Sequence, residues 1–400
     1  MNLNSLPSSE RVHIGFFGLR NAGKSSLVNA VTGQSLSVVS DVKGTTTDPV
    51  KKSMELLPIG PVVIIDTPGI DDEGGLGELR VKKAKEMLSK TDVAILVTDA
   101  VKGLQKAEKD LIAVFEDKDI PYIVAFNKAD LKENTDIGSK NEIAVSALTG
   151  KNINELKELI GSLVKAGGKS KPIVRDLIKS GDRVILVIPI DKSAPKGRLI
   201  LPQQMTIREI LDCGAVAITC RDTELSETLT CFNGAPKLII TDSQAFGRVS
   251  QIVPDNIPMT SFSILFARYK GELTELVKGA SVLSELKDGD KVLISEGCTH
   301  HRQCNDIGTV KMPAWIKAFS NAKLNFDFTS GGEFPEDLSG YALVVHCGGC
   351  MINEKEMKSR IEKCVNSKVP IVNYGVAIAH IHGILKRSLE VFPGVLEILG

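Results

Sequence analysis

The chain has no excess of charge of either sign and no long apolar run. Each absence argues against one class of partner. Lys+Arg and Asp+Glu each number 49, so the formal net charge is zero. General nucleic-acid binding needs clustered basic charge that displaces counterions, so this balance argues against it. No stretch of the sequence reaches the ~18 consecutive apolar residues of a membrane helix. We therefore expect neither nucleic acid nor a membrane as a partner.

An apolar signal segment is also missing at the start of the sequence. Residues 1–10 are polar and do not resemble a secretion signal. The eight cysteines are then expected to be reduced thiols in the cytoplasm, where some can bind metal. A chain of 400 residues, 42% of them hydrophobic, is too long for one ordinary core, so two or three domains are expected.

Apolar runs alternate with amphipathic stretches through the first part of the chain. The runs with the length of a buried strand are 12–17, 62–66, 92–98, 122–127 and 143–146. This alternation is typical of a mostly parallel sheet that is covered by helices on both faces. We predict an α/β protein whose first domain is a doubly wound sheet.

A basic, glycine-containing joint separates this first domain from two smaller α/β units. We predict a flexible N-terminus at 1–10, a nucleotide-binding domain at 11–166, a linker at 167–175, a middle domain at 176–265 and a C-terminal domain at 266–400. Strand and helix patterns alternate in both later units, so the α/β class extends over the whole chain.

Residues 18–25 read Gly-Leu-Arg-Asn-Ala-Gly-Lys-Ser, a full match to the phosphate-binding pattern G-x-x-x-x-G-K-[ST]. Glycines let backbone N–H groups point at phosphate oxygens, and the following helix adds partial positive charge. Lys24 is expected to reach the β- and γ-phosphates, and Ser25 to bind Mg²⁺. The nucleotide contacts expected from this loop are Gly18, Asn21, Ala22, Gly23, Lys24, Ser25 and Ser26.

Three later segments carry the other parts of a guanine-nucleotide site. Asp66-Thr-Pro-Gly69 follows an apolar run, which places Asp66 near Mg²⁺ and the Gly69 amide near the γ-phosphate. Asn127-Lys128-Ala-Asp130 follows another strand, and a carboxylate there accepts from both N1–H and the exocyclic amine of guanine. Ser146 and Ala147 follow a third strand and are expected to close over the base. GTP and GDP are therefore the expected ligands.

The order and spacing of these segments resemble the TrmE/Era-like, translation-factor-related GTPases. The resemblance implies that Thr46 is the switch threonine on Mg²⁺ and the γ-phosphate, with Lys24, Thr46 and Gly69 as the catalytic set. Ile70 stands where small signalling GTPases have the glutamine that orients water. Asn21 matches the position that helps to hold K⁺ in the tRNA-modifying relatives, although asparagine also tolerates the left-handed backbone of such loops.

A second constellation, of soft metal ligands, lies far along the chain: Cys298-x-His300 and His346-Cys347-x-x-Cys350. The Cys-Gly-Gly-Cys spacing lets one metal centre bind both thiolates. Cys298 and Cys347 each follow a predicted strand, so in one parallel sheet both would lie at the carboxyl edge, where open α/β sheets form ligand crevices.

Three thiolates without a well-spaced fourth cysteine favour an iron–sulfur cluster with one iron held differently. A structural zinc site is more naturally a closed set of four ligands. His300, His301 and His346 are candidate fourth ligands, so both metals stay open on the residues alone.

A GTPase domain followed by this Cys/His pattern resembles the HydF family of FeFe-hydrogenase maturation GTPases, over essentially the whole chain. The resemblance implies a 4Fe–4S cluster on Cys298, Cys347 and Cys350 with an exchangeable fourth site. It places His300 and His346 nearby, as ligands or as outer groups. It further implies a scaffold that takes a di-iron precursor from radical-SAM maturases to apo FeFe-hydrogenase, and a homodimer formed through the middle domain.

Two other functions stay open. One is a switch GTPase that acts on tRNA or the ribosome and carries a structural zinc module; the neutral charge and the missing basic, aromatic-rich module weigh against it. The other is a cluster-bearing redox enzyme regulated by GTP, which lacks a flavin or nicotinamide fingerprint. The expected cofactors are GTP or GDP, Mg²⁺, K⁺ and a 4Fe–4S cluster, and the expected activity is K⁺-stimulated hydrolysis of GTP.

Overall fold

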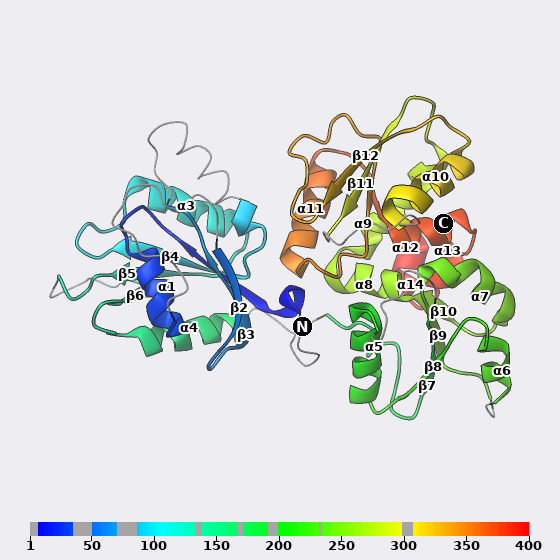
Figure 1. Cartoon of the computed structure of the whole chain (residues 1–400), viewed down its shortest axis with the longest axis horizontal. Helices are drawn as coiled ribbons and strands as arrows, with labels where there is room; N and C mark the ends of the chain where they lie inside the picture. Colours follow the sequence, from blue (N-terminus) through cyan, green and yellow to red (C-terminus); the bar gives the residue numbers. More distant parts are fainter. Residues whose placement is uncertain are drawn as a thin grey trace. The chain divides into compact units, whose positions relative to one another are not determined.

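The computed structural model of the protein describes residues 7–34, 50–69, 86–132, 138–166, 171–190, 199–231, 234–297 and 307–399. The chain forms two compact units, Met1–Ser170 and Lys171–Gly400, each of mixed helices and strands (Figure 1). The predicted α/β class is therefore confirmed. Within the described ranges, no helix has both the length and the apolar character that a membrane crossing requires.

The first unit is built on a six-stranded sheet with the order β2-β3-β1-β4-β5-β6. All neighbouring strands are parallel except β2, which pairs antiparallel with β3. The strands are β1 Val12–Phe17, β2 Val50–Leu56, β3 Gly60–Asp66, β4 Val93–Asp99, β5 Tyr122–Asn127 and β6 Glu142–Ala144. The helices are the 3-10 turn η1 Ser8–Glu10, α1 Lys24–Thr32, α3 Lys106–Asp117 and α4 Ile153–Ala166.

Successive residues of the central strands point into opposite cores. On β4, Ile95 belongs to the core that includes α1 and α4, whereas Leu96 belongs to the core that includes α3. Burial on both faces explains why these strands are continuously apolar in sequence. The edge strand β2 escaped prediction because its side chains, such as Lys51 and Lys52, are exposed and form no apolar run.

The second unit contains two four-stranded parallel sheets, with the orders β10-β9-β7-β8 and β12-β11-β13-β14. The strands are β7 Arg183–Val187, β8 Val216–Cys220, β9 Leu238–Thr241, β10 Met259–Ser261, β11 Lys291–Glu296, β12 Asn325–Ser330, β13 Leu343–His346 and β14 Ile371–Asn373. The α-helices are α5 Leu201–Asp212, α6 Leu225–Thr230, α7 Phe246–Ile252, α8 Phe262–Lys270, α9 Leu273–Ser281, α10 Met312–Ser320, α11 Glu354–Asn366, α12 Tyr374–Ile381, α13 Leu385–Leu389 and α14 Pro393–Leu396. Shorter turns are η2 Ser243–Ala245, η3 Val282–Ser284, the π-helix η4 Ile307–Lys311 and η5 Glu397–Leu399.

One hydrophobic core runs through both sheets of the second unit, from Ile173 to Phe392. Helix α8 contacts α5 beside the first sheet and both α11 and α12 beside the second. Helix α8 thereby packs the two sheets into one body. Its last residue, Lys270, reaches the loop that follows β13. The predicted limits of the middle and C-terminal domains stay predictions.

Candidate functional site

The loop between β1 and α1 is shaped by two glycines with positive φ. Gly18 has φ +146°, and a Cβ there would approach the carbonyl oxygen of Val97 to 2.1 Å. Gly23, the N-cap of α1, has φ +84°, and a Cβ there would lie 2.4 Å from Nδ2 of Asn127. No side chain fits either place without strain. The loop therefore brings bare backbone to the N-terminus of α1, which is the geometry that binds phosphate.

Lys24 lies inside this loop, with only 7% of its surface exposed. Its Nζ donates to the carbonyl oxygens of Gly18 at 3.2 Å and Leu19 at 3.3 Å. Ser25 and Ser26 follow it in the first turn of α1. The ammonium group is thus poised where a phosphate chain would lie along the loop.

Asp66, the last residue of β3, shows how a cation would fit. Its Oδ2 accepts a hydrogen bond from Ser25 Oγ at 2.8 Å. Its Oδ1 is buried and has no hydrogen-bond partner among the residues that the structure describes. A buried carboxylate oxygen without a donor is costly, and a divalent cation with oxygen ligands would satisfy it. Gly69 lies close to Arg20 of the loop, whereas Thr46 is outside the described residues.

Asn127 ties the base-recognition segments to the phosphate loop. Its Nδ2 donates to the Ala22 carbonyl oxygen at 3.0 Å, and its Oδ1 accepts from the Ala147 N–H at 3.0 Å. Asp130 Oδ1 accepts from Ser146 Oγ at 2.5 Å. Residues from three separate segments therefore converge at the carboxyl edge of the sheet.

Asp99 belongs to the same network, although the sequence did not single it out. Lys128 has φ +64°, and its Nζ donates to the Asn21 carbonyl oxygen at 2.8 Å and to Asp99 Oδ2 at 2.7 Å. Burial acts to raise the pKa of the Asp99 carboxyl, but hydrogen bonds from Lys128 and the Val101 amide outweigh it, so the pKa lies below its usual value. The available signal was its place at the end of β4, in register with Asn127 on β5.

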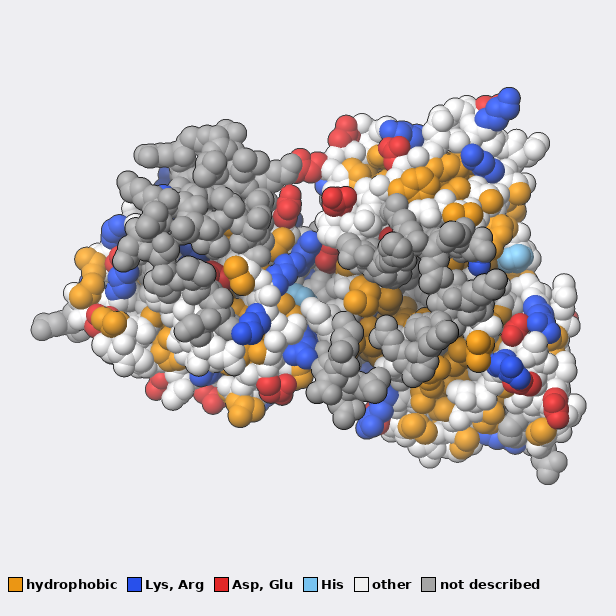
Figure 2. Space-filling view, in the orientation of Figure 1, with side chains coloured by type: hydrophobic (Ala, Val, Ile, Leu, Met, Phe, Trp, Pro, Cys, Tyr) orange, Lys and Arg blue, Asp and Glu red, His pale blue; other side chains and the backbone are white. Residues whose placement is uncertain are grey.

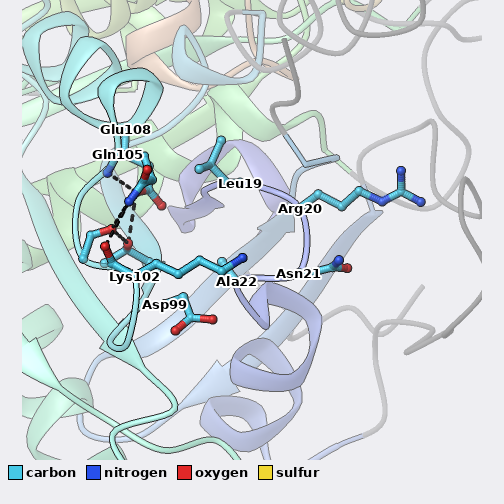
Figure 3. Close-up of a pocket in the computed structure, with 10 residues that line it drawn as sticks. Leu19, Arg20, Asn21, Ala22, Asp99, Lys102, Gln105 and Glu108 are labelled. Carbon is cyan, nitrogen blue, oxygen red and sulfur yellow. Dashed lines mark hydrogen bonds between the residues drawn. The ribbon is translucent and has the colours of Figure 1, made fainter. Parts of the chain in front are cut away.

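A pocket lies beside the loop, and Figure 3 shows Arg20 and Asn21 at one end of it and Gln105 and Glu108 at the other. The Glu108 carboxylate accepts from the Thr98 hydroxyl at 3.0 Å and from the Gln105 N–H at 2.9 Å. Burial raises the pKa of Glu108 above its usual value. The Glu108 carboxylate is thus held by protein groups, while Arg20 and Asn21 of the loop also line the pocket.

The Cys-Gly-Gly-Cys turn follows β13. The Sγ of Cys347 accepts from the backbone N–H of Gly297 at 3.0 Å and from that of Gly349 at 3.4 Å. Gly297 comes directly after β11, which pairs in parallel with β13. The expected pairing of these two strand ends is therefore confirmed. Backbone N–H groups aimed at a sulfur stabilise the thiolate, which is the form that binds metal.

Cys298 and His300 lie outside the described residues, so the predicted ligand set is only partly in view. Cys347 and Cys350 are half-buried, and neither forms a disulfide with another described residue. His346 is fully buried at the end of β13. Among the residues with described positions, no three His, Cys, Asp or Glu side chains form a metal-binding group. The donors that are described, two thiols in a glycine turn, fit a thiolate-bound metal centre.

The side chain of Lys270 binds the backbone of this turn. No pattern in the sequence indicated this role for Lys270. It ends α8 with 2% of its surface exposed, and its Nζ donates to the carbonyl oxygens of Gly349 at 3.5 Å, Cys350 at 3.3 Å and Ile352 at 2.8 Å. Lysine is almost never buried unless its charge is matched. Here the carbonyl oxygens of the turn help to stabilise the lysine charge, and these hydrogen bonds attach the turn to α8.

Replacing Lys270 with methionine should destabilise the second unit by about 1–3 kcal/mol, because buried carbonyl groups lose their donor. The measurement is urea unfolding followed by the fluorescence of Trp315 on α10, the single tryptophan of the chain. The control, Lys278→Met on α9, removes a lysine whose side chain is 55% exposed and should cost less than about 0.5 kcal/mol. Equal losses in the two variants would contradict a supporting role for Lys270.

Three family models match successive parts of the chain. Residues 13–128 match a model described as 50S ribosome-binding GTPase. Residues 173–271 match the hydrogen maturase F dimerization domain, and residues 274–391 match the hydrogen maturase F tetramerization domain.

Curated GTPases are similar to about two fifths of the chain. The tRNA modification GTPase MnmE of Clostridioides difficile is 34% identical over 158 residues, which are 38% of this chain and 34% of the relative. GTPase Der of Wolinella succinogenes is 33% identical over 165 residues, 37% of this chain and 35% of the relative. The chain thus spans about a third of the length of these relatives. The crystal structure of Aquifex aeolicus Era bound to GDP·AlF4⁻ aligns at 22% identity over 52% of this chain and 92% of Era, with a TM-score of 0.34.

The two hydrogen maturase F models meet near residue 272 and together account for the second unit. The GTPase model covers the phosphate loop and the Asp66 segment and ends at Lys128, so the first unit contains a P-loop GTPase domain. The chain therefore belongs to the hydrogen maturase F (HydF) family.

Proposed function

We propose that the protein is a GTP-hydrolysing scaffold that binds a 4Fe–4S cluster and assembles or delivers the di-iron precursor of apo FeFe-hydrogenase. The observation that carries the proposal is the 3.0 Å hydrogen bond from the Gly297 N–H to Cys347 Sγ. It brings the chain that enters Cys298 to the Cys-Gly-Gly-Cys turn. Membership of the HydF family supports the rest, with radical-SAM maturases as donors of the precursor and the cytoplasm as the site of action.

In the first unit, the proposed reaction is hydrolysis of GTP to GDP and phosphate. Lys24 passes its hydrogen bonds from the loop carbonyl groups to phosphate oxygens as the nucleotide binds. Ser25, Asp66 and Thr46 would hold Mg²⁺, which supplies positive charge to the β- and γ-phosphates. The Gly69 amide would contact the γ-phosphate, so hydrolysis would remove that contact.

In the second unit, Cys298, Cys347 and Cys350 would hold the 4Fe–4S cluster. When bound, the cluster supplies one iron whose remaining position can be exchanged. The Gly297 amide and Lys270 hold Cys347 and its turn in place whatever occupies that position. A carrier needs both an exchangeable iron position and a fixed turn, because the precursor must bind firmly and then leave without disturbing the cluster ligands.

The middle segment supports a homodimer. Strand β8 lies at the edge of the β10-β9-β7-β8 sheet, with Val216 48% exposed and the neighbouring Leu211 of α5 57% exposed. Figure 2 shows hydrophobic side chains at the surface over this sheet. An exposed edge strand with apolar side chains is a template for pairing with a second copy. We assign the dimer contact to this edge.

A second candidate function is a tRNA- or ribosome-associated switch GTPase with a structural zinc module. It is favoured by the descriptions of the MnmE relative and of the GTPase model. The zero net charge and the hydrogen maturase F matches weigh against it. Anaerobically purified protein distinguishes the two, since the scaffold is brown with iron and sulfide, whereas the zinc protein is colourless.

Asp130→Asn should exchange the base preference. The variant loses charge-assisted hydrogen bonds to guanine, worth about 1.5–3 kcal/mol each, so GTP affinity falls at least ~10-fold. Xanthosine triphosphate, which presents a carbonyl where guanine has its exocyclic amine, should gain affinity. Titration calorimetry measures both, with Asp117→Asn on the exposed end of α3 as the control. Unchanged GTP binding in Asp130→Asn would remove Asp130 from the base site.

GTP hydrolysis should be faster in KCl than in NaCl of equal ionic strength. If a K⁺ ion held by Asn21 stabilises the transition state by about 1.4 kcal/mol, the difference is ~10-fold. Phosphate release gives the rates, and Asn21→Ala should hydrolyse GTP equally slowly in both salts. Equal rates for the wild type in the two salts would show that no K⁺ ion takes part.

The cluster ligands are tested by anaerobic reconstitution of Cys298→Ala, Cys347→Ala and Cys350→Ala, with Cys231→Ala as the control at an exposed thiol. Each of the first three should lose the visible and EPR spectra of the 4Fe–4S cluster and fail to activate apo-hydrogenase with the maturases. The control should match the wild type. A cluster that survives any one of the three substitutions reassigns that ligand, with Cys304 as the first substitute.

A further inference from the structure

His346 lies at the carboxyl end of β13, directly before Cys347, and is closed off from solvent. It is the last residue of β13 and has 0% of its surface exposed. In the sheet it lies between Ser295 of β11 and Asn373 of β14, with which it is in register. Its position next to Cys347 makes it a candidate iron ligand on sequence, so the partners of its two ring nitrogens decide its role.

Both ring nitrogens of His346 are engaged by protein atoms. Nδ1 lies 2.8 Å from the carbonyl oxygen of Cys347, and Nε2 lies 3.0 Å from Nη1 of Arg360. A carbonyl oxygen only accepts hydrogen bonds, and a guanidinium group only donates them. The ring must therefore carry its proton on Nδ1 and present its lone pair from Nε2 to Arg360.

Arg360 is held by several partners, so moving it away from Nε2 of His346 would cost free energy. It is 4% exposed, and its Nη2 donates to the Gly331 carbonyl oxygen at 2.6 Å and to Glu356 Oε1 at 2.7 Å. Its guanidinium group also lies over the Phe334 ring, 5.3 Å from the centroid. Because Glu356 is also buried, moving Arg360 away would break an ion pair with a buried carboxylate, which is unfavourable.

We propose that His346 is a positioning residue for Cys347, held by Arg360, and that it is not a ligand of the cluster. Metal on Nε2 would displace Arg360, and metal on Nδ1 would remove the hydrogen bond to the Cys347 carbonyl group. The His346 ring fixes the carbonyl oxygen of Cys347, while the Gly297 amide fixes its sulfur. The exchangeable iron position is thereby left to the precursor or to a ligand other than His346.

The inference rests on the proposed function only where it speaks of the cluster, because the tautomer exists in the metal-free protein. In apo-protein labelled with ¹⁵N-histidine, the His346 signal is identified as the one that is missing in His346→Asn. Its nitrogen chemical shifts should be those of a ring protonated at Nδ1 alone. A ring protonated at Nε2 would overturn the proposal. This measurement needs no cluster and is unaffected if the cluster assignment fails.

The second measurement is pulsed EPR of the reduced cluster in the same labelled protein. His346 should contribute no ligand-type nitrogen coupling, so that any coupling from another histidine persists in His346→Asn. A coupling that is present in the wild type and lost in both His346→Asn and His346→Gln would make His346 a ligand and end the proposal. Wild-type protein without iron and sulfide would instead refute the proposed function, and leave the tautomer result standing.

Two substitutions separate the roles of the two nitrogens. His346→Asn keeps an N–H donor near the place of Nδ1, so the cluster should be retained. His346→Gln keeps a polar group only near the place of Nε2, so iron should be lost to a chelator about 10-fold faster than from the wild type. His380→Asn on α12, where the ring contacts Ser284 away from the turn, is the control and should behave as wild type. Equal iron loss from the Asn and Gln variants would contradict the assignment of the positioning hydrogen bond to Nδ1.

Discussion

Parallel pairing of β11 with β13 is the constraint that brings Gly297 and the Cys-Gly-Gly-Cys turn to one edge of the sheet. Ser295 and His346 are in register, so the chain leaving each strand emerges at the same edge, and the Gly297 N–H reaches Cys347 Sγ across 50 positions of sequence. A register slip of one residue would turn the alternate side chains to the other face of the sheet. The GTPase unit obeys the same rule, because Asp99 and Asn127 end adjacent parallel strands beside the phosphate loop. Both sites thus lie where open α/β sheets collect ligands.

A buried lysine supports each of the two ligand loops through backbone carbonyl groups. Lys24 holds the carbonyl oxygens of Gly18 and Leu19, and Lys270 holds those of the Cys-Gly-Gly-Cys turn. The two differ in what they are free to do. Lys24 belongs to the loop that it supports, so it can turn to a phosphate chain without disturbing another element. Lys270 belongs to α8 and links this helix to the Cys-Gly-Gly-Cys turn, so its hydrogen bonds do not depend on a bound ligand.

The second unit builds its site from both of its family-defined segments. Lys270 lies within the part that matches the dimerization model, whereas the turn lies within the part that matches the tetramerization model. Arg360, Glu356 and His346 add a buried polar network behind the turn. Such networks seldom add net stability, but they can favour one arrangement over its alternatives.

The sequence by itself determined the strands and the short motifs. The runs 12–17 and 122–127 coincide with β1 and β5 because strands buried on both faces are mostly apolar. The phosphate loop, the Asp66 segment and the Cys-Gly-Gly-Cys turn were recognisable because their chemistry depends on spacing between near neighbours. Only the tertiary structure decided that Lys270 supports a turn 80 residues away, that β2 joins an edge through its backbone, and that Arg360 takes the lone pair of His346. These contacts arise from packing between distant elements, and no local pattern records them.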